Sequence, residues 1–93
     1  MTDSVKETRT VRVVNEYGMH ARPAAMFVKV AARFEADLTV EKDGVNVSGK
    51  SIMGLMTLQA SRGTVLALIA EGADAKEMLD QLETLVKNNF EVD

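Results

Sequence analysis

The single histidine of the chain, His20, has the surroundings best suited to chemistry. It lies in the segment Gly18-Met19-His20-Ala21-Arg22-Pro23, which holds the only proline. Proline favours the first turn of a helix, so His20 is expected just before a helix N-terminus. Free backbone N–H groups and the helix dipole favour an anion there. Arg22 adds a planar guanidinium that fits phosphate oxygens. Because a neutral imidazole is a nucleophile near pH 7, this segment is suited to holding a phosphoryl group on His20.

A structural explanation of the same residues is also open. A lone histidine between a loop and a helix is most often a solvated or capping residue. Arg22 would then be a surface charge and Pro23 a helix starter. Metal binding is not expected, because the chain has no cysteine and no Asp or Glu within four residues after His20. Glu16 lies nearby but is equally well explained as a loop charge.

A second segment, Lys50-Ser51-Ile52-Met53-Gly54-Leu55-Met56, combines a helix-capping serine with apolar residues. Serine at position 51 is a favoured N-cap. The apolar side chains surround this short helix rather than forming one stripe, so some of them are expected to face solvent as an adaptable docking surface. The alternative, usual for methionine in helices, is that they belong to the core.

Hydrophobic periodicity predicts the elements that hold these two segments. A loose lead-in covers residues 1–8, and the helix after His20 has its apolar face at Phe27, Val30, Ala31 and Phe34. The Asp43-Gly44 pair between alternating runs predicts a hairpin that places Val40 opposite Val47. Asp74 and Glu77 resemble a capping box. The elements expected are strands at 10–14, 38–42, 45–47 and 64–70, and helices at about 23–34, 51–60 and 75–88.

This order, strand-helix-strand-strand-helix-strand-helix, predicts a two-layer α+β sandwich. The 93 residues make one domain, residues 1–93. The 46% hydrophobic and 27% charged fractions are those of an ordinary soluble domain, and the net charge of −3 argues against nucleic acid as the main partner. No apolar run approaches the roughly 18 residues of a membrane span. The polar N-terminus does not resemble a secretory signal, so a cytoplasmic location is expected.

Residues 18–24, Gly-Met-His-Ala-Arg-Pro-Ala, resemble the active-site signature of the HPr family. These histidine-containing phosphocarriers serve the phosphoenolpyruvate-dependent phosphotransferase system of sugar transport. Residues 50–54, Lys-Ser-Ile-Met-Gly, resemble the segment around the family's regulatory serine. The spacing of the two motifs, the order of elements and the length also match. The resemblance therefore covers about residues 9–90.

The resemblance implies an open-faced β-sandwich, with a four-stranded antiparallel sheet covered on one face by three helices (βαββαβα). It implies that His20 accepts a phosphoryl group at Nδ1 from phosphorylated enzyme I and donates it to enzyme II A domains. Arg22 and the first amides of the helix near Ala21 would hold the phosphoryl oxygens, and Pro23 would set the helix start. Such a carrier needs no cofactor and turns over only with its partners, so it is not an enzyme by itself.

The resemblance further implies a docking face and a regulatory switch. Ser51 would be phosphorylated by an ATP-dependent HPr kinase/phosphorylase, which would place a negative charge in the docking face and slow transfer at His20. A monomer is expected, because the docking face of a carrier must stay free. The docking face would consist of Ala24, Ala25, Val28 and Lys29 from the first helix and Ile52, Met53 and Met56 from the second.

Two other function classes compete with the carrier. One is a regulatory binding module of a nitrogen-related or transporter-less phosphotransferase system, which would act mainly through phosphorylated Ser51. Met19 and the ending Phe90-Glu91-Val92-Asp93 resemble the nitrogen-related branch, whereas the Ser-Ile-Met-Gly segment resembles members under kinase control. The intact His-Ala-Arg-Pro motif argues against a binding-only role. The other is a nucleic-acid binder, which the few aromatic residues and the negative charge disfavour.

Overall fold

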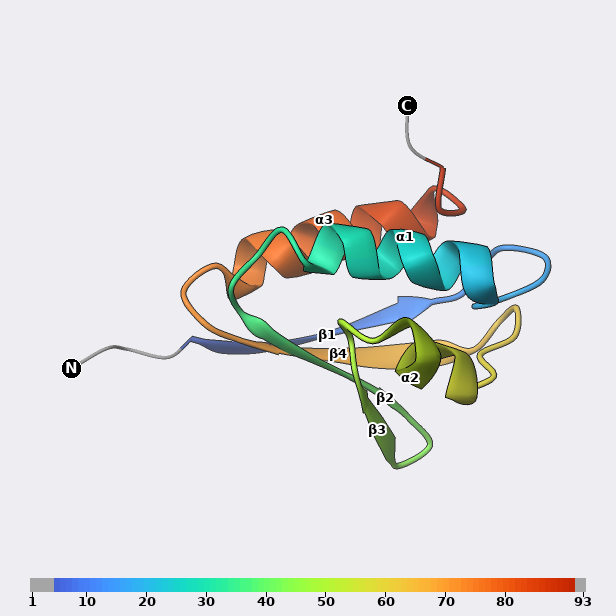
Figure 1. Cartoon of the computed structure of the whole chain (residues 1–93), viewed down its shortest axis with the longest axis horizontal. Helices are drawn as coiled ribbons and strands as arrows, with labels where there is room; N and C mark the ends of the chain where they lie inside the picture. Colours follow the sequence, from blue (N-terminus) through green and yellow to red (C-terminus); the bar gives the residue numbers. More distant parts are fainter. Residues whose placement is uncertain (1–4, 92–93) are drawn as a thin grey trace.

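The computed structural model describes residues 5–91, which form a four-stranded sheet and three helices (Figure 1). The order of elements is the one that the sequence predicts. None of the helices in this range is long and apolar enough to cross a membrane. The elements are β1 (Lys6–Arg12), α1 (Ala21–Ala31), β2 (Asp37–Lys42), β3 (Val45–Ser48), α2 (Ile52–Thr57), β4 (Val65–Glu71) and α3 (Ala75–Lys87).

The sheet is antiparallel, with strand order β1-β4-β2-β3. The apolar run that forms β4 lies between β1 and β2, so its prediction as a central strand is confirmed. The β2–β3 hairpin is confirmed as well, because Val40 pairs with Val47. Asp43 and Gly44 both have positive φ, 52° and 83°, which is the conformation of a two-residue hairpin turn of this sequence type.

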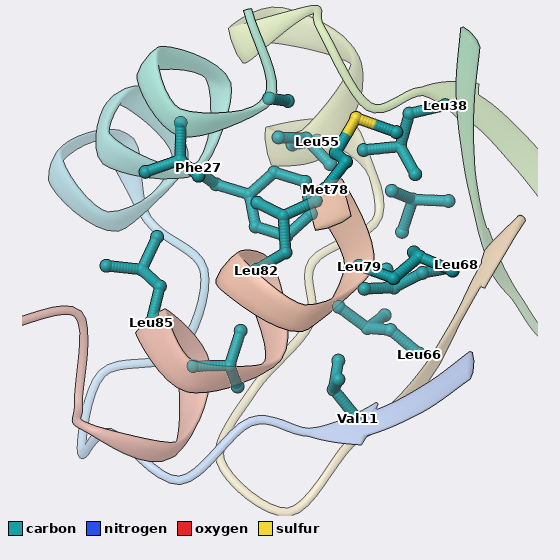
Figure 2. Close-up of a cluster of buried hydrophobic side chains, with 14 of the residues drawn as sticks. Val11, Phe27, Leu38, Leu55, Leu66, Leu68, Met78, Leu79, Leu82 and Leu85 are labelled. Atoms are coloured by element: carbon teal, nitrogen blue, oxygen red, sulfur yellow. The ribbon is translucent and has the colours of Figure 1, made fainter. Parts of the chain in front are cut away.

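The helices α1 and α3 run side by side over one face of the sheet, and the core lies between them and the strands (Figure 1). In Figure 2 Phe27 extends from α1 toward α3, while Leu66 and Leu68 come up from β4 beneath it. All three side chains are fully buried. The stripe predicted for α3 is confirmed, and its buried residues are Ala75, Met78, Leu79, Leu82, Leu85 and Val86.

The predicted loose lead-in is wrong for residues 6–8, because β1 begins at Lys6 and pairs with β4 along its whole length. Residues 1–4 lie outside the described range. The helix-facing positions at the start of this strand are charged, which hides the strand pattern in the sequence. Arg9 reaches α3, where its guanidinium forms ion pairs with Asp80 and, at 3.2 Å, with Glu83. At this position an ion pair with α3 takes the place of the apolar contact that would give the strand its alternating pattern.

The capping box predicted at Asp74 and Glu77 is also wrong. Asp74 is the N-cap residue of α3, but its side chain makes no capping hydrogen bond. Its carboxylate instead accepts hydrogen bonds from the backbone N–H groups of Glu35, at 3.0 Å, and Ala36, at 2.9 Å. These bonds, led by that from Glu35, lower the pKa of Asp74. Asp74 therefore fastens the connection between α1 and β2 to the start of α3.

Candidate functional site

His20 is the N-cap residue of α1, as predicted, with extended backbone angles (φ −85°, ψ −172°). The first hydrogen bond of the helix runs from the Ala24 N–H to the His20 carbonyl at 3.0 Å. Because Pro23 has no N–H, the amides of Ala21 and Arg22 are the donors at this helix end without an intrahelical partner. The imidazole is exposed and makes no capping hydrogen bond. The ring and two amides are therefore free at one helix end.

A turn held by hydrogen bonds places His20 at the start of α1. The Gly18 N–H donates to the Asn15 carbonyl at 3.2 Å, and the Asn15 side-chain amide donates to the Gly18 carbonyl at 2.6 Å. The Met19 N–H donates to the Ala60 carbonyl at 2.8 Å. Gly18 has φ +71°, and a Cβ at this position would lie only 2.4 Å from the Ala60 oxygen. Only glycine fits this close approach, so the turn has a fixed position against the connection between α2 and β4.

Two open hollows flank His20, and both are lined by His20 and Tyr17. One continues over Arg22 and Met26 to the C-terminal residues 89–91. The other leads to Met56 near the end of α2; Met19, Gln59, Ala60 and Ser61 complete its lining. The rings of Tyr17 and His20 meet edge to face, with centroids 6.3 Å apart and planes 77° apart.

Sequence reasoning missed two parts of this site, Tyr17 and residues 89–91. The C-terminal residues are distant in the sequence and carry no motif that points to His20. They arrive there because α3 ends beside the start of α1 and the chain then turns back sharply. The Phe90 N–H donates to the Leu85 carbonyl at 2.8 Å, which is the helix-closing bond of a Schellman motif. Phe90 is buried, so the segment is anchored.

The second predicted segment forms as expected. Ser51 is the N-cap residue of α2, and its Oγ accepts a hydrogen bond from the Gly54 N–H at 3.0 Å. Leu55 is fully buried, whereas Met53 is 74% exposed. Ile52 and Met56 are exposed as well. This short helix therefore presents apolar side chains to solvent, as its sequence pattern indicates.

The proposed docking residues of α1 divide between surface and core. Ala25 and Lys29 are exposed and Val28 is half-buried. Ala24 has no exposed surface, so its prediction as a docking residue is wrong. Ala24 packs into the core because it lies three residues before Phe27 and seven before Ala31, on the buried stripe of α1. Pro23 is also buried, and it is the third residue of α1, inside the first turn, where a missing N–H costs no intrahelical hydrogen bond.

The charge on α1 is entirely positive, although the chain as a whole has a net charge of −3. The charged residues of α1 are Arg22 and Lys29, and α2 carries none. Lys50 precedes α2, and its Nζ donates to the Phe34 carbonyl at 2.7 Å. Within residues 5–91 no group of three or more His, Cys, Asp or Glu side chains is placed to hold a metal ion. Fold and site define a class of small α+β proteins that present a free histidine at a basic helix N-terminus.

Comparisons with known proteins identify the family. A family model described as the PTS HPr component phosphorylation site matches residues 7–88. The chain is 45% identical over 83 residues to the phosphocarrier protein HPr of Treponema pallidum, covering 89% of this chain and 94% of that protein. It is 51% identical over 77 residues to the HPr-like protein Crh of Bacillus subtilis, covering 83% and 91%. The crystal structure of HPr-C-His from Thermoanaerobacter tengcongensis superposes with a TM-score of 0.88 at 42% identity, covering 94% and 98%.

The chain belongs to the HPr family of the phosphotransferase system. Proteins of this family are phosphocarriers rather than self-sufficient enzymes. The family also includes the Crh relative, so the matches span both the carrier HPr and an HPr-like protein. The predicted open-faced sandwich is confirmed by the order of elements, by the antiparallel sheet and by this solved neighbour.

Proposed function

We propose that His20 accepts a phosphoryl group from phosphorylated enzyme I and passes it to an enzyme II A domain. The observation that carries this proposal is the state of His20 at the start of α1. Its ring is exposed and uncapped, and the amides of Ala21 and Arg22 lie free beside it. An anion bound at this position meets both unpaired N–H groups and the positive end of a helix dipole.

The transfer step needs only the imidazole and groups that hold charge. The lone pair of Nδ1 attacks phosphorus, and the bond from phosphorus to the donor residue breaks, with its electron pair leaving to the donor. The proton on Nε2 then exchanges with solvent, according to pH. Arg22 and the two amides stabilise the oxygens of the group in flight. Donation to the next protein is the reverse of this step.

The docking surface proposed for both partners consists of Ala25, Val28, Lys29, Ile52, Met53 and Met56. Its centre is apolar and accessible, and Lys29 within it and Arg22 at the start of the same helix give it positive charge. Such a surface suits a partner with an apolar groove and an acidic rim, because complementary charge speeds encounter. We propose a cytoplasmic monomer, since a second copy on this surface would block transfer.

Ser51 is the proposed regulatory site and the target of an HPr kinase/phosphorylase. Phosphorylation would add a charge of roughly −1.5 to −2 beside the exposed Ile52 and Met53. That charge is tolerated at a helix N-terminus but would be desolvated poorly in a docked complex. The second candidate function, a regulatory binding module acting through phosphorylated Ser51, is supported by the 51% identity to the HPr-like protein Crh.

The test is phosphorylation by phosphoenolpyruvate and purified enzyme I, followed by intact mass. We expect an acid-labile, base-stable gain of one phosphoryl group that is absent from a His20→Ala protein with an unchanged circular dichroism spectrum. A gain that persists in the variant contradicts the assignment of His20. No gain with an enzyme I that phosphorylates a known HPr, together with an acid-stable gain at Ser51 from HPr kinase and ATP, favours the binding module.

A further inference from the structure

Few groups hold the side chain of His20, the residue proposed to react. Its side chain makes no capping bond, and among residues 5–91 no side-chain hydrogen bond fixes its ring. A nucleophile in a protein is ordinarily oriented by a neighbouring group, because an imidazole that rotates freely presents its reactive nitrogen only part of the time. A contact that restricts the ring would raise the share of orientations in which the reactive nitrogen is available.

The only aromatic contact described at His20 comes from Tyr17. The ring centroids lie 6.3 Å apart and the planes are 77° apart, which is within the range of a favourable edge-to-face pair. Tyr17 is 77% exposed, so its ring is not placed there by burial in the core. It lines both hollows beside His20 and thus stands next to the imidazole where the two hollows meet.

The loop gives Tyr17 a fixed place. Tyr17 lies inside the turn closed by the two hydrogen bonds between Asn15 and Gly18. Met19, on its other side, is buried and bonded to the Ala60 carbonyl. The backbone on both sides of Tyr17 is therefore anchored. This allows the exposed Tyr17 side chain to keep a constant position beside the His20 ring.

We propose that Tyr17 is a positioning residue whose aromatic ring orients the His20 imidazole for phosphoryl transfer. This inference rests on the proposed function of His20. The ring acts by contact, and the phenol oxygen has no part in it. Loss of one edge-to-face contact corresponds to a change of about two- to tenfold.

The test compares Tyr17→Phe, Tyr17→Leu and Tyr17→Ala with the parent protein. With enzyme I as the phosphoryl donor, kcat is expected to fall about two- to tenfold in the Leu and Ala proteins, while KM stays within about twofold. Tyr17→Phe is expected to match the parent. Val14→Ala, which truncates an exposed apolar side chain earlier in the same connection, is the control for loop disturbance.

A second measurement does not depend on transfer. NMR relaxation of the ring carbons of unphosphorylated His20 reports how freely the imidazole moves, and this mobility is expected to rise in the Ala and Leu proteins but not in Tyr17→Phe. If the parent accepts no phosphate, the proposed function fails while this measurement still tests Tyr17.

Three results would overturn the inference. A rise in KM with constant kcat and unchanged mobility of the His20 ring would make Tyr17 a partner contact. An equal loss in Tyr17→Phe would assign the effect to the hydroxyl. Parent-like behaviour of all three variants would remove Tyr17 from the site.

Discussion

The molecule places two side chains that accept phosphate in other proteins at the N-caps of two helices, and it treats them differently. Ser51 accepts the Gly54 N–H at 3.0 Å and so completes the start of α2. His20 makes no capping bond and leaves the amides of α1 free. A serine side chain is short enough for its oxygen to accept a hydrogen bond from a backbone N–H of its own helix, whereas the His20 imidazole extends into solvent.

This contrast separates stability from reactivity. The cap at Ser51 satisfies a backbone donor, so α2 depends on it locally. The open end at His20 leaves donors unsatisfied by the fold, and these are the groups that a phosphoryl anion needs. The 11 residues of α1 and its packing on the core sustain the helix without a side-chain cap. The six residues of α2 offer less support of that kind.

The largest expected effect that sharpens this contrast is at Arg22. In Arg22→Ala the rate of His20 phosphorylation by enzyme I is expected to fall about 10- to 100-fold, because a hydrogen bond to a charged group contributes roughly 1.5–3 kcal/mol. Arg22→Lys should lie between, since an ammonium lacks the planar fork. Quench-flow measurement of phosphoprotein formation gives the rates. The matched control is Arg33→Ala, at an exposed arginine past the far end of α1. An equal fall in that protein would mean that Arg22 acts only through the overall positive charge of the surface.

The next effect tests the regulatory half of the comparison. Ser51→Asp is expected to slow His20 phosphorylation by enzyme I about tenfold, because a carboxylate in the docking surface must lose water without gaining a partner. Gln81→Glu makes the same change in net charge on the exposed side of α3. The rate of that control should match the parent. Equal slowing in both proteins would show an effect of net charge instead of position.

For the stability of the fold, the Ser51 side chain should matter more than the His20 side chain. Ser51→Ala is expected to lower the free energy of unfolding by about 1 kcal/mol, through loss of the bond to Gly54. His20→Ala should change it by less than about 0.5 kcal/mol, because an exposed side chain without a capping bond is removed. Urea midpoints at a common m value measure both changes. A larger loss in the histidine variant would mean that His20 holds the helix after all.

The smallest expected effect is on the unfolding midpoint at acid pH, and it comes from a third N-cap residue, Asp74. Its pKa lies below the ordinary 3.8 because backbone N–H groups donate to the ionised carboxylate. The stabilisation is therefore full above about pH 4 and is lost as pH falls through the lowered pKa. The difference in unfolding midpoint between the parent and Asp74→Asn should shrink over that range. Asp37→Asn, at an exposed carboxylate starting β2, is the control, and a constant difference would contradict the assignment.

Local signals were sufficient for much of the fold and site. The stripe of α3, the Asp43-Gly44 turn, the Ser51 cap and the position of His20 at a helix start depend on residues within a few positions of each other. Periodicity, turn chemistry and capping act over this range, so the sequence by itself determined them. The same holds for the family motif that spans residues 18–24.

Tertiary structure decided the rest, because each remaining feature depends on a partner that is distant in the chain. Arg9 in β1 forms its ion pairs with residues of α3, and Asp74 finds its amides at the end of the α1–β2 connection instead of in its own helix. Ala24 is buried by how α1 packs on the sheet. Residues 89–91 reach the hollow beside His20 only because α3 ends there. No local pattern encodes such meetings, since they arise from the packing of whole elements.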